Sequence, residues 1–468
     1  MARHGTRRAF FSRTGRWRVA ALLVSGVLAL ALLVTVFSGG WEGGGGPGGT
    51  GGPGGSDGDR GGGGRTALGF GFTHTQYSAD HGDDGARDAA AKLLAASPMP
   101  QNQHIMGWGV DNPEPRPGSY NFGDLDRRVA LMRKTGATPV LTLCCAPDWM
   151  KGGTAGKTNW AQKSLEMAPL AGHYKDFAQL AGVIAKRYPD IHHFVVWNEF
   201  KGFFDESRNR WDYEGYTQLY NLVYAELKKQ NANNLVGGPY ISMDSHPPDN
   251  ATNASSVRGP WGSVDQRSVD AISYWNTHKK GADFVAVDGA SYTRENDRLL
   301  PDEFGATQKF ADVTGWLTRT TGLPVWWSEW YVEPPDANDA RRGWTEEHRT
   351  AVQATAMQQL ATAGAATAFY WNPEGTTADC PGCLWRSTEL PDGGSGLPML
   401  DLLARFAKAF PPGTRFHSVG VTGVDGGTVR VLASDATILV VNTQNRALTA
   451  TVDGHTLNLG PYDVQWLG

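Results

Sequence analysis

The chain has 468 residues, with 43 Lys and Arg against 47 Asp and Glu and a net charge of −4. This length leaves room for a barrel of roughly 250–350 residues together with accessory segments. No basic stripe follows the first 20 residues, so we expect no nucleic-acid partner. The 17 Trp can stack on sugar rings, but they can equally fill a large core.

The N-terminus is a basic segment followed by an apolar run. Six Arg precede residues 19–37, and this run has about the length needed to span a bilayer. The positive flank stays in the cytoplasm, so the rest of the chain lies outside. We predict a cytoplasmic segment and transmembrane signal anchor over residues 1–38. The protein would then lie in the cell membrane with its main domain extracytoplasmic, or be secreted if the segment is cleaved. Residues 39–66 are Gly-rich and predict a flexible linker.

Residues 67–411 alternate short apolar runs with amphipathic stretches. Runs of β-branched and aromatic residues predict strands, and apolar residues at helical spacing predict helices. The predicted strands are 68–74, 103–110, 138–144, 191–197, 234–240, 283–288, 324–329 and 366–371. The predicted helices are 123–135, 172–188, 213–230, 267–280, 307–321, 346–363 and 397–409.

This alternation predicts an α/β fold with a parallel sheet. No Gly-rich nucleotide turn follows the first strand, so a closed (β/α)8 TIM barrel fits better than an open doubly wound sheet. From residue 412 to residue 468 the sequence shows short strands with Gly turns and no helical pattern. It predicts a small C-terminal β-sandwich-like module.

The four Cys form two close pairs, Cys144 with Cys145 and Cys380 with Cys383. A zinc site at the second pair would need two more ligands, and the local sequence offers no further His or Cys. The pattern favours a short Cys380–Cys383 disulfide in an oxidising compartment.

Two predicted strands end in a glutamate. The fourth ends in Trp-Asn-Glu with Glu199, and the seventh ends in Trp-Ser-Glu with Glu329. A single carboxylate at a strand end is by default solvated or ion-paired. A barrel, however, brings both strand ends to one rim, where catalytic groups lie. Two carboxyl groups flanking a bond are what glycosidic cleavage needs, one as acid and one as nucleophile or base.

These motifs resemble the clan A glycoside hydrolases, and family 39 most of all. Trp-Asn-Glu on strand four, a Glu on strand seven and the segments 111–126 and 139–149 carry the resemblance, which covers residues 68–410. Two departures stand out. Trp-Asn-Glu is commonly followed by Pro-Asn, but here Phe200-Lys201 follows, and Ser328 replaces a common Thr before Glu329.

The resemblance implies the roles of several residues. Glu199 would be the acid/base, Glu329 the nucleophile, and Asn198 the amide that binds the sugar 2-hydroxyl. Such enzymes retain anomeric configuration, with carboxyl groups about 5–5.5 Å apart. We expect the pKa of Glu199 to be raised, so that it is protonated while Glu329 is ionised. Tyr292 either orients the nucleophile or packs in the core.

Further candidates for substrate binding lie near the predicted rim. His74 either faces the sugar or is a hydrogen-bonded structural histidine. Each Trp near the rim is by default a packing residue, but we expect at least two to line the cleft. The four candidates are Trp108, Trp149, Trp330 and Trp371.

Together these features predict a retaining glycoside hydrolase that acts on an extracellular or cell-envelope polysaccharide or oligosaccharide. A transglycosylase and a catalytically inactive carbohydrate-binding barrel are the alternatives. The chemistry needs no cofactor or metal, and the sequence suggests no metal site.

Overall fold

The computed structural model describes residues 65–333, 343–371, 373–375 and 381–468. The predicted membrane anchor, residues 1–38, and nearly all of the predicted linker lie outside the described residues. Within the described ranges, no helix is both long and apolar enough to cross a membrane.

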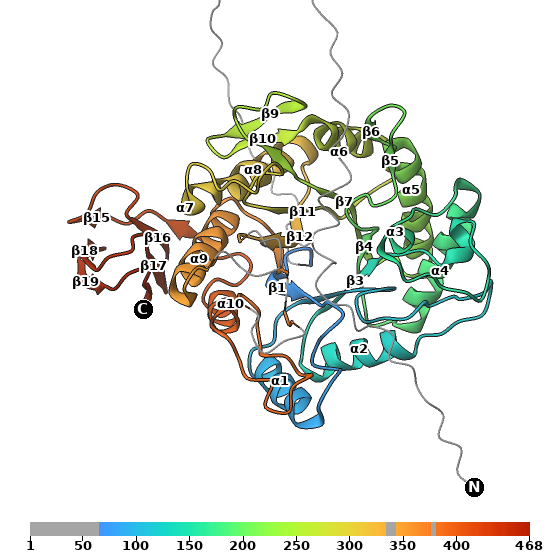
Figure 1. Ribbon diagram of the computed structural model, residues 1–468, viewed down its shortest axis with the longest axis horizontal. Helices are drawn as coiled ribbons and strands as arrows, with labels where there is room; N and C mark the ends of the chain where they lie inside the picture. Colours follow the sequence, from blue (N-terminus) through green and yellow to red (C-terminus); the bar gives the residue numbers. More distant parts are fainter. Residues whose placement is uncertain (1–64, 334–342, 372, 376–380) are drawn as a thin grey trace, which may run out of the picture.

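Parallel strands close into a barrel at the centre of the molecule (Figure 1). Their order around the barrel is β1-β13-β12-β11-β7-β4-β3-β2, so strands adjacent in the described barrel follow chain order. This confirms the predicted (β/α)8 fold class. The strands are β1 (Gly69–Thr73), β2 (Gln101–His104), β3 (Pro139–Leu143), β4 (His193–Val196), β7 (Leu235–Ser242), β11 (Phe284–Ala290), β12 (Val325–Tyr331) and β13 (Thr367–Tyr370).

Helices surround the barrel, and each predicted helix is present within two residues of its expected ends. The longer ones are α1 (Asp84–Ala96), α2 (Gly123–Lys134), α4 (Tyr174–Arg187), α5 (Tyr213–Gln230), α6 (Gln266–His278), α8 (Gln308–Thr321), α9 (Glu346–Thr362) and α10 (Pro398–Ala409). Helix α1 was not predicted. Its N-terminus is capped by the side chain of Asp83, which accepts hydrogen bonds from two backbone amides.

The second strand differs from its predicted range of 103–110. The observed strand β2 is polar, with the sequence Gln-Asn-Gln-His, although every residue in it is buried. Its side chains are paired inside the sheet: Asn102 donates to Thr73 and accepts from Thr142. Apolar patterning cannot find such a strand, because hydrogen bonds rather than apolar contacts satisfy its buried side chains. Residues 105–110 instead form a turn closed by Gly107 and Val110.

The end of the barrel opposite the strand C-termini is filled by a separate apolar cluster. Phe284 and Trp326 stack there with ring centroids 3.8 Å apart. This plug makes the barrel a solid scaffold, so polar side chains gather only toward the other end.

Shorter elements extend the loops at the C-terminal end of the strands. These are β5 (Phe204–Asp205), β6 (Arg210–Trp211), β8 (Ser245–His246), β9 (Ala254–Gly259), β10 (Gly262–Asp265), α3 (Gln162–Leu165), α7 (Glu303–Ala306) and the 3-10 helices η2 (Asp148–Lys151) and η3 (Ala171–His173).

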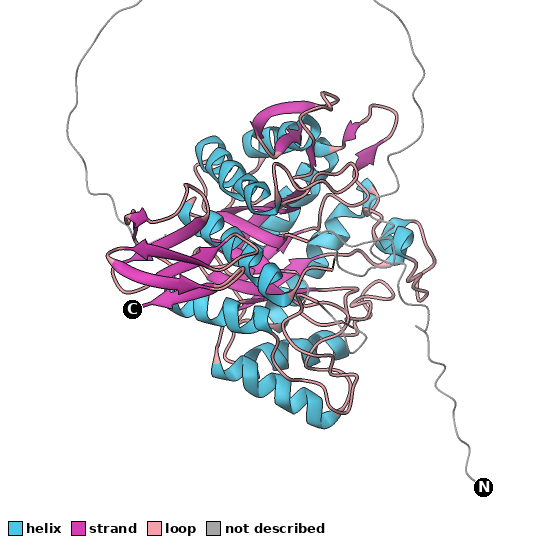
Figure 2. Cartoon of the chain, turned by 60° about the vertical axis from the view of Figure 1, so that its left-hand side comes forward, coloured by secondary structure: helices cyan, strands magenta, loops and turns pink. Residues whose placement is uncertain are grey.

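The C-terminal residues form two antiparallel sheets beside α9 and α10 (Figures 1 and 2). One sheet has the order β14-β16-β17-β20 and the other β15-β18-β19, with an apolar cluster between them. This agrees with the predicted sandwich-like module. Phe410 anchors the module by stacking on Trp466 at 5.9 Å. The strands are β14 (Phe416–His417), β15 (Val421–Thr422), β16 (Val429–Ser434), β17 (Ile438–Asn442), β18 (Leu448–Val452), β19 (His455–Leu459) and β20 (Val464–Leu467).

Cys144 and Cys145, directly after β3, form a disulfide with each other. Cys383 is also disulfide-bonded. Its predicted partner, Cys380, lies outside the described residues.

A buried ion pair ties α2 to the loop after β1. Arg128 Nε lies 2.9 Å from Asp80 Oδ1, and both side chains are at most 3% exposed. Arg128 also donates to the carbonyl of Thr75 and to Gln103 on β2. The pair therefore joins the first two strands to the helix that covers them.

We expect Asp80→Ala to lower the free energy of unfolding by about 3–5 kcal/mol, because it leaves a buried guanidinium without its counter-ion. Urea unfolding followed by tryptophan fluorescence would measure the loss. Asp88→Ala is the matched control, since Asp88 pairs with Lys134 at the surface, where both side chains are 66% exposed. A loss of about 0.5 kcal/mol or less fits such a pair. Equal losses in the two variants would contradict the assigned importance of the buried pair.

Candidate active site

Glu199 and Glu329 lie at the same end of the barrel. Glu199 follows β4 directly, and Glu329 lies in the C-terminal half of β12. The charge of Glu199 raises the pKa of Glu329, so the two carboxyl groups lie close enough to interact. The parallel strands thus bring together the two carboxyl groups that the sequence predicted.

A β-bulge directs Glu329 into the barrel. The pairing of β11 with β12 shifts register after Val287 and Trp327, so that Asp288 lies opposite Glu329. Trp327 points outward, where its indole donates to Thr314 on α8. A bulge changes the side to which a strand residue points and is common next to active sites.

A second bulge directs Tyr240 at Glu329. Between β7 and β11 the register shifts beyond Pro239 and Ala286, and Tyr240 takes a φ of 51°. The Tyr240 hydroxyl donates a short hydrogen bond to Glu329 Oε1. This hydrogen bond orients the carboxyl group and favours its ionised form.

Asp288 adds a third carboxyl group to the site. It is fully buried on β11, accepts a hydrogen bond from Ser242 Oγ at 3.1 Å and lies within hydrogen-bonding reach of Glu199. Burial and then the charges of Glu199 and Glu329 raise the pKa of Asp288 well above its usual value. Asp288 therefore favours its neutral form, whose hydroxyl can donate a hydrogen bond to a neighbouring carboxylate.

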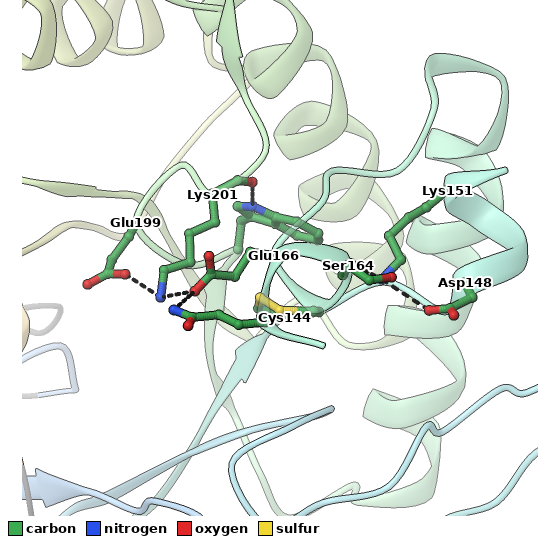
Figure 3. Close-up of a disulfide and its surroundings, with 10 residues drawn as sticks. Cys144, Asp148, Lys151, Ser164, Glu166, Glu199 and Lys201 are labelled. Carbon is green, nitrogen blue, oxygen red and sulfur yellow. Dashed lines mark hydrogen bonds and ion pairs between the residues drawn. A yellow bond between two sulfur atoms is a disulfide. The ribbon is translucent and has the colours of Figure 1, made fainter. Parts of the chain in front are cut away.

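The turn after β4 places a lysine on Glu199. Trp197, Glu199 and Phe200 all have positive φ values, of 71°, 48° and 53°. The turn is fixed by the Trp197 indole, which donates to the carbonyl of Lys201 at 2.8 Å. Lys201 Nζ then lies 2.5 Å from Glu199 Oε2 and 3.3 Å from Glu166 Oε1 (Figure 3).

The protonation pattern is the reverse of the one expected from the sequence. Burial would raise the pKa of Glu199, but the ammonium of Lys201 outweighs it and holds the pKa below its usual value. Burial and the charge of Glu199 raise the pKa of Glu329 to about 8. The expectation of a raised pKa at Glu199 was therefore wrong, because the sequence did not reveal that Lys201 would reach its carboxylate.

His104, at the end of β2, contributes a neutral ring to the same site. Burial and the charge of Lys201 lower the pKa of His104 to about 3, so the imidazole carries no charge at neutral pH. It lies beside Asn198, which is 1% exposed, and it stacks on Trp108 at a centroid distance of 4.3 Å.

Tyr292 and His74, which the sequence suggested for the site, contact residues other than the two glutamates. Tyr292 packs against Tyr331, with ring centroids 5.9 Å apart, while the hydroxyl on Glu329 is that of Tyr240. His74 is fully buried and its ring nitrogens pair with Ser78 and Gln101. This arrangement favours the structural alternative for His74.

The four candidate tryptophans divide into two groups. Trp330 is fully buried against Phe310 and Tyr370, so it presents no face to a sugar, and its prediction as a platform was wrong. The other three are partly exposed in loops at the C-terminal end of the strands. Trp108 lies 5.3 Å from the ammonium of Lys201, and the indole of Trp149 donates to the carbonyl of Glu114 at 2.8 Å. Trp371 follows β13.

Two further residues of the site were recognisable from their place in the sequence. Tyr240 and Asp288 end the predicted fifth and sixth strands, as Glu199 and Glu329 end the fourth and seventh. Lys201 offered no signal beyond its place next to the motif. As for metals, none of the described residues form a group of three or more His, Cys, Asp or Glu suited to binding an ion.

No protein-family model and no curated protein matches the sequence. Solved structures match in fold. A GH30 endoxylanase from Clostridium papyrosolvens has a TM-score of 0.51 at 13% identity, over 86% of this chain and 95% of that chain. A GH39 β-xylosidase from Caulobacter crescentus has a TM-score of 0.49 at 14% identity, over 80% of this chain and 77% of that chain. An endo-β-1,4-mannanase from Thermotoga petrophila has a TM-score of 0.49 at 12% identity, over 86% of this chain and 90% of that chain. The chain therefore has the fold of the GH30 endoxylanase.

We expect Tyr240→Phe to raise the pKa of Glu329 further, because the carboxylate loses a hydrogen-bond donor. A charge-assisted hydrogen bond is worth about 1.5–3 kcal/mol, so kcat/KM for a glycoside should fall roughly 10- to 100-fold. Because Glu329 titrates at about pH 8, above Glu199, its pKa sets the basic limb of the pH profile, and that limb should move to higher pH. Tyr224→Phe, a change on the outer helix α5, is the control. An unchanged basic limb in Tyr240→Phe would refute the role given to this hydroxyl.

Proposed function

We propose that the protein is a retaining glycoside hydrolase, with Glu199 as acid/base and Glu329 as nucleophile. The observation that carries the proposal is the pair of interacting carboxyl groups at the C-terminal ends of β4 and β12, in the mouth of a closed barrel. Glycosidic cleavage through an oxocarbenium-like transition state needs a pair of this kind.

The reaction follows from the two positions. Glu329, ionised, attacks the anomeric carbon while Glu199 gives its proton to the leaving oxygen. Water then attacks the covalent glycosyl-enzyme, and Glu199 takes a proton from that water. Tyr240 stabilises the carboxylate of Glu329 before attack and after release. Asn198, buried beside Glu199, is proposed to bind the 2-hydroxyl of the sugar.

Before reaction, Glu199 and Glu329 together hold the one proton that the mechanism needs, but it lies on Glu329 and not on Glu199. Glu199 carries the charge beside Lys201, whereas Glu329 retains a proton up to about pH 8. One proton must move to Glu199 and one must leave Glu329 before reaction, which leaves the net charge unchanged. Positive charge that develops at the anomeric carbon favours this redistribution, because it stabilises the ionised nucleophile.

We also propose a polysaccharide or oligosaccharide substrate outside the cytoplasm. The structural neighbours carry the names xylosidase, endoxylanase and mannanase, which supports a glycosidic substrate. The Arg-rich start and apolar run of residues 1–38 support a membrane anchor with an extracytoplasmic barrel.

Removing each carboxyl group tests the catalytic roles. Against a panel of aryl glycosides and bacterial exopolysaccharides, Glu329→Ala should lose activity by about 10⁴-fold or more. Glu199→Ala should lose roughly 10²–10⁴-fold on substrates with poor leaving groups and much less on dinitrophenyl glycosides. Added azide should restore turnover of Glu199→Ala with an activated substrate and yield a glycosyl azide.

Glu347→Ala, an exposed change on α9, serves as the control and should retain full activity. Wild-type turnover in Glu329→Ala would refute the assignment. Mass spectrometry of the products separates the remaining outcomes. Transfer of the glycosyl group to a sugar acceptor would indicate a transglycosylase. Glycan binding without cleavage over long incubation would indicate a binding protein.

A further inference from the structure

Lys201 lies between two carboxylates that the catalytic scheme treats differently. Its ammonium is 2.5 Å from Glu199 and 3.3 Å from Glu166 (Figure 3). Glu199 must take up a proton before it can act as an acid, whereas Glu166 has no part in the chemistry. A cation this close to Glu199 opposes that protonation, so the ion pair between Lys201 and Glu199 must weaken before the reaction.

The position of Glu166 is built into the fold. Glu166 follows α3, and Gln162 on that helix donates to its carboxylate at 3.0 Å. The turn that holds Lys201 packs directly on this segment. A Cβ at Gly202 would lie 2.1 Å from the amide nitrogen of Ala168, and Gly202 has a φ of 78°. Only glycine fits this close approach, and it fixes the distance between the lysine turn and Glu166.

Hydrogen bonds fix the backbone of the turn 197–202, which carries Lys201, while the lysine side chain lies within reach of both carboxylates. The amide of Lys201 donates to the carbonyl of Asn198 at 3.0 Å, and its own carbonyl accepts from Trp197. The side chains of Lys201, Glu199 and Glu166 are 18%, 19% and 23% exposed, so all three are partly accessible to solvent. A flexible four-carbon stem can move its ammonium between neighbouring acceptors without a change in the backbone.

We propose that Lys201 is a positioning residue whose ammonium has two alternative partners. It pairs mainly with Glu199 in the resting enzyme. It moves to Glu166 when the glycosidic oxygen of the substrate replaces it beside Glu199. Glu166 is then the counter-ion that allows Glu199 to become an acid. When Lys201 moves, Glu199 gains one proton and Glu329 loses one. This inference rests on the proposed glycosidase activity.

Other charged and titratable groups also face Glu199. They are His104 from β2, Tyr240 from β7, Asp288 from β11, and Glu329 and Tyr331 from β12. Burial and neighbouring charges keep His104 and the two tyrosines neutral at neutral pH. Asp288 and Glu329 are shared by every variant of Lys201 and Glu166, so differences between those variants report on Lys201.

The two single variants should shift the pH profile in opposite directions. In Glu166→Gln, Lys201 has only Glu199 as a partner, so the pKa of Glu199 and with it the acidic limb of kcat/KM should move to lower pH. In Lys201→Met, Glu199 loses its cation, and the acidic limb should move to higher pH by about one unit or more. In the double variant the effect of Glu166→Gln should disappear, because Glu166 acts through Lys201. Lys201→Arg should restore part of the wild-type profile.

Lys228→Met is the matched control. Lys228 pairs with Asp283 at 2.9 Å with both side chains 23% exposed, at the opposite end of the barrel. It should leave the profile unchanged. Shifts in the same direction for the two single variants, or simple additivity in the double variant, would overturn the proposal.

A second measurement separates this proposal from the proposed function. Infrared difference spectra of the wild type against Glu199→Gln follow the titration of the Glu199 carboxyl group without any substrate. The pKa of Glu199 should fall in Glu166→Gln and rise in Lys201→Met. If it stays constant in both, the role of Lys201 is refuted even for an active enzyme. If it shifts as expected but no glycoside is cleaved, the proposed function fails and the coupling stands.

Discussion

Three carboxyl groups meet at the C-terminal end of the barrel strands, two of them buried, and this crowding governs the chemistry of the site. Glu199, Asp288 and Glu329 cannot all be ionised so close together, because burial and mutual repulsion both oppose charge. The ammonium of Lys201 decides which of them carries it. It holds the charge on Glu199, and the protons therefore remain on Asp288 and Glu329. The protonation of each group is thus a property of the cluster rather than of one residue.

The crowding is maintained by a strained backbone at the ends of two strands, β4 and β7. Tyr240, Trp197, Glu199 and Phe200 all have positive φ values, which cost non-glycine residues of order 1–3 kcal/mol each. The rest of the barrel supplies this energy through close packing. Phe200, for example, stacks on Tyr216 with centroids 4.1 Å apart, while the hydroxyl of Tyr216 donates to the carbonyl of Val196 on β4. The aromatic side chains that pack beneath the turn hold Glu199 where an unstrained chain would not place it.

Periodicity predicted the barrel because most of its strands are apolar and its helices amphipathic. It failed at β2, where Asn102 and its neighbours are buried through side-chain hydrogen bonds, and apolar patterning carries no trace of such pairing. The two glutamates were predictable from strand ends alone. The hydroxyl on Glu329 was not assigned correctly, because a bulge rather than the alternation of the strand turns Tyr240 inward. Trp330 was misplaced for a different reason: successive residues of a strand point to opposite faces, so the neighbour of the inward-pointing Glu329 faces outward and packs on Phe310.

The residue after Trp-Asn-Glu departs from the family 39 pattern that the sequence resembles, and this departure changes the backbone. That pattern commonly has Pro where this chain has Phe200, and proline fixes φ near −65°. Phe200 has a φ of 53°, so a proline could not follow the same path. The turn that results brings Lys201 onto Glu199 and presses Gly202 against the segment of Glu166. The absence of a proline at position 200 thus goes together with a cation, Lys201, beside Glu199. The charge of Glu199 therefore cannot be understood from the glutamate motif alone, because it depends on the two residues that follow it.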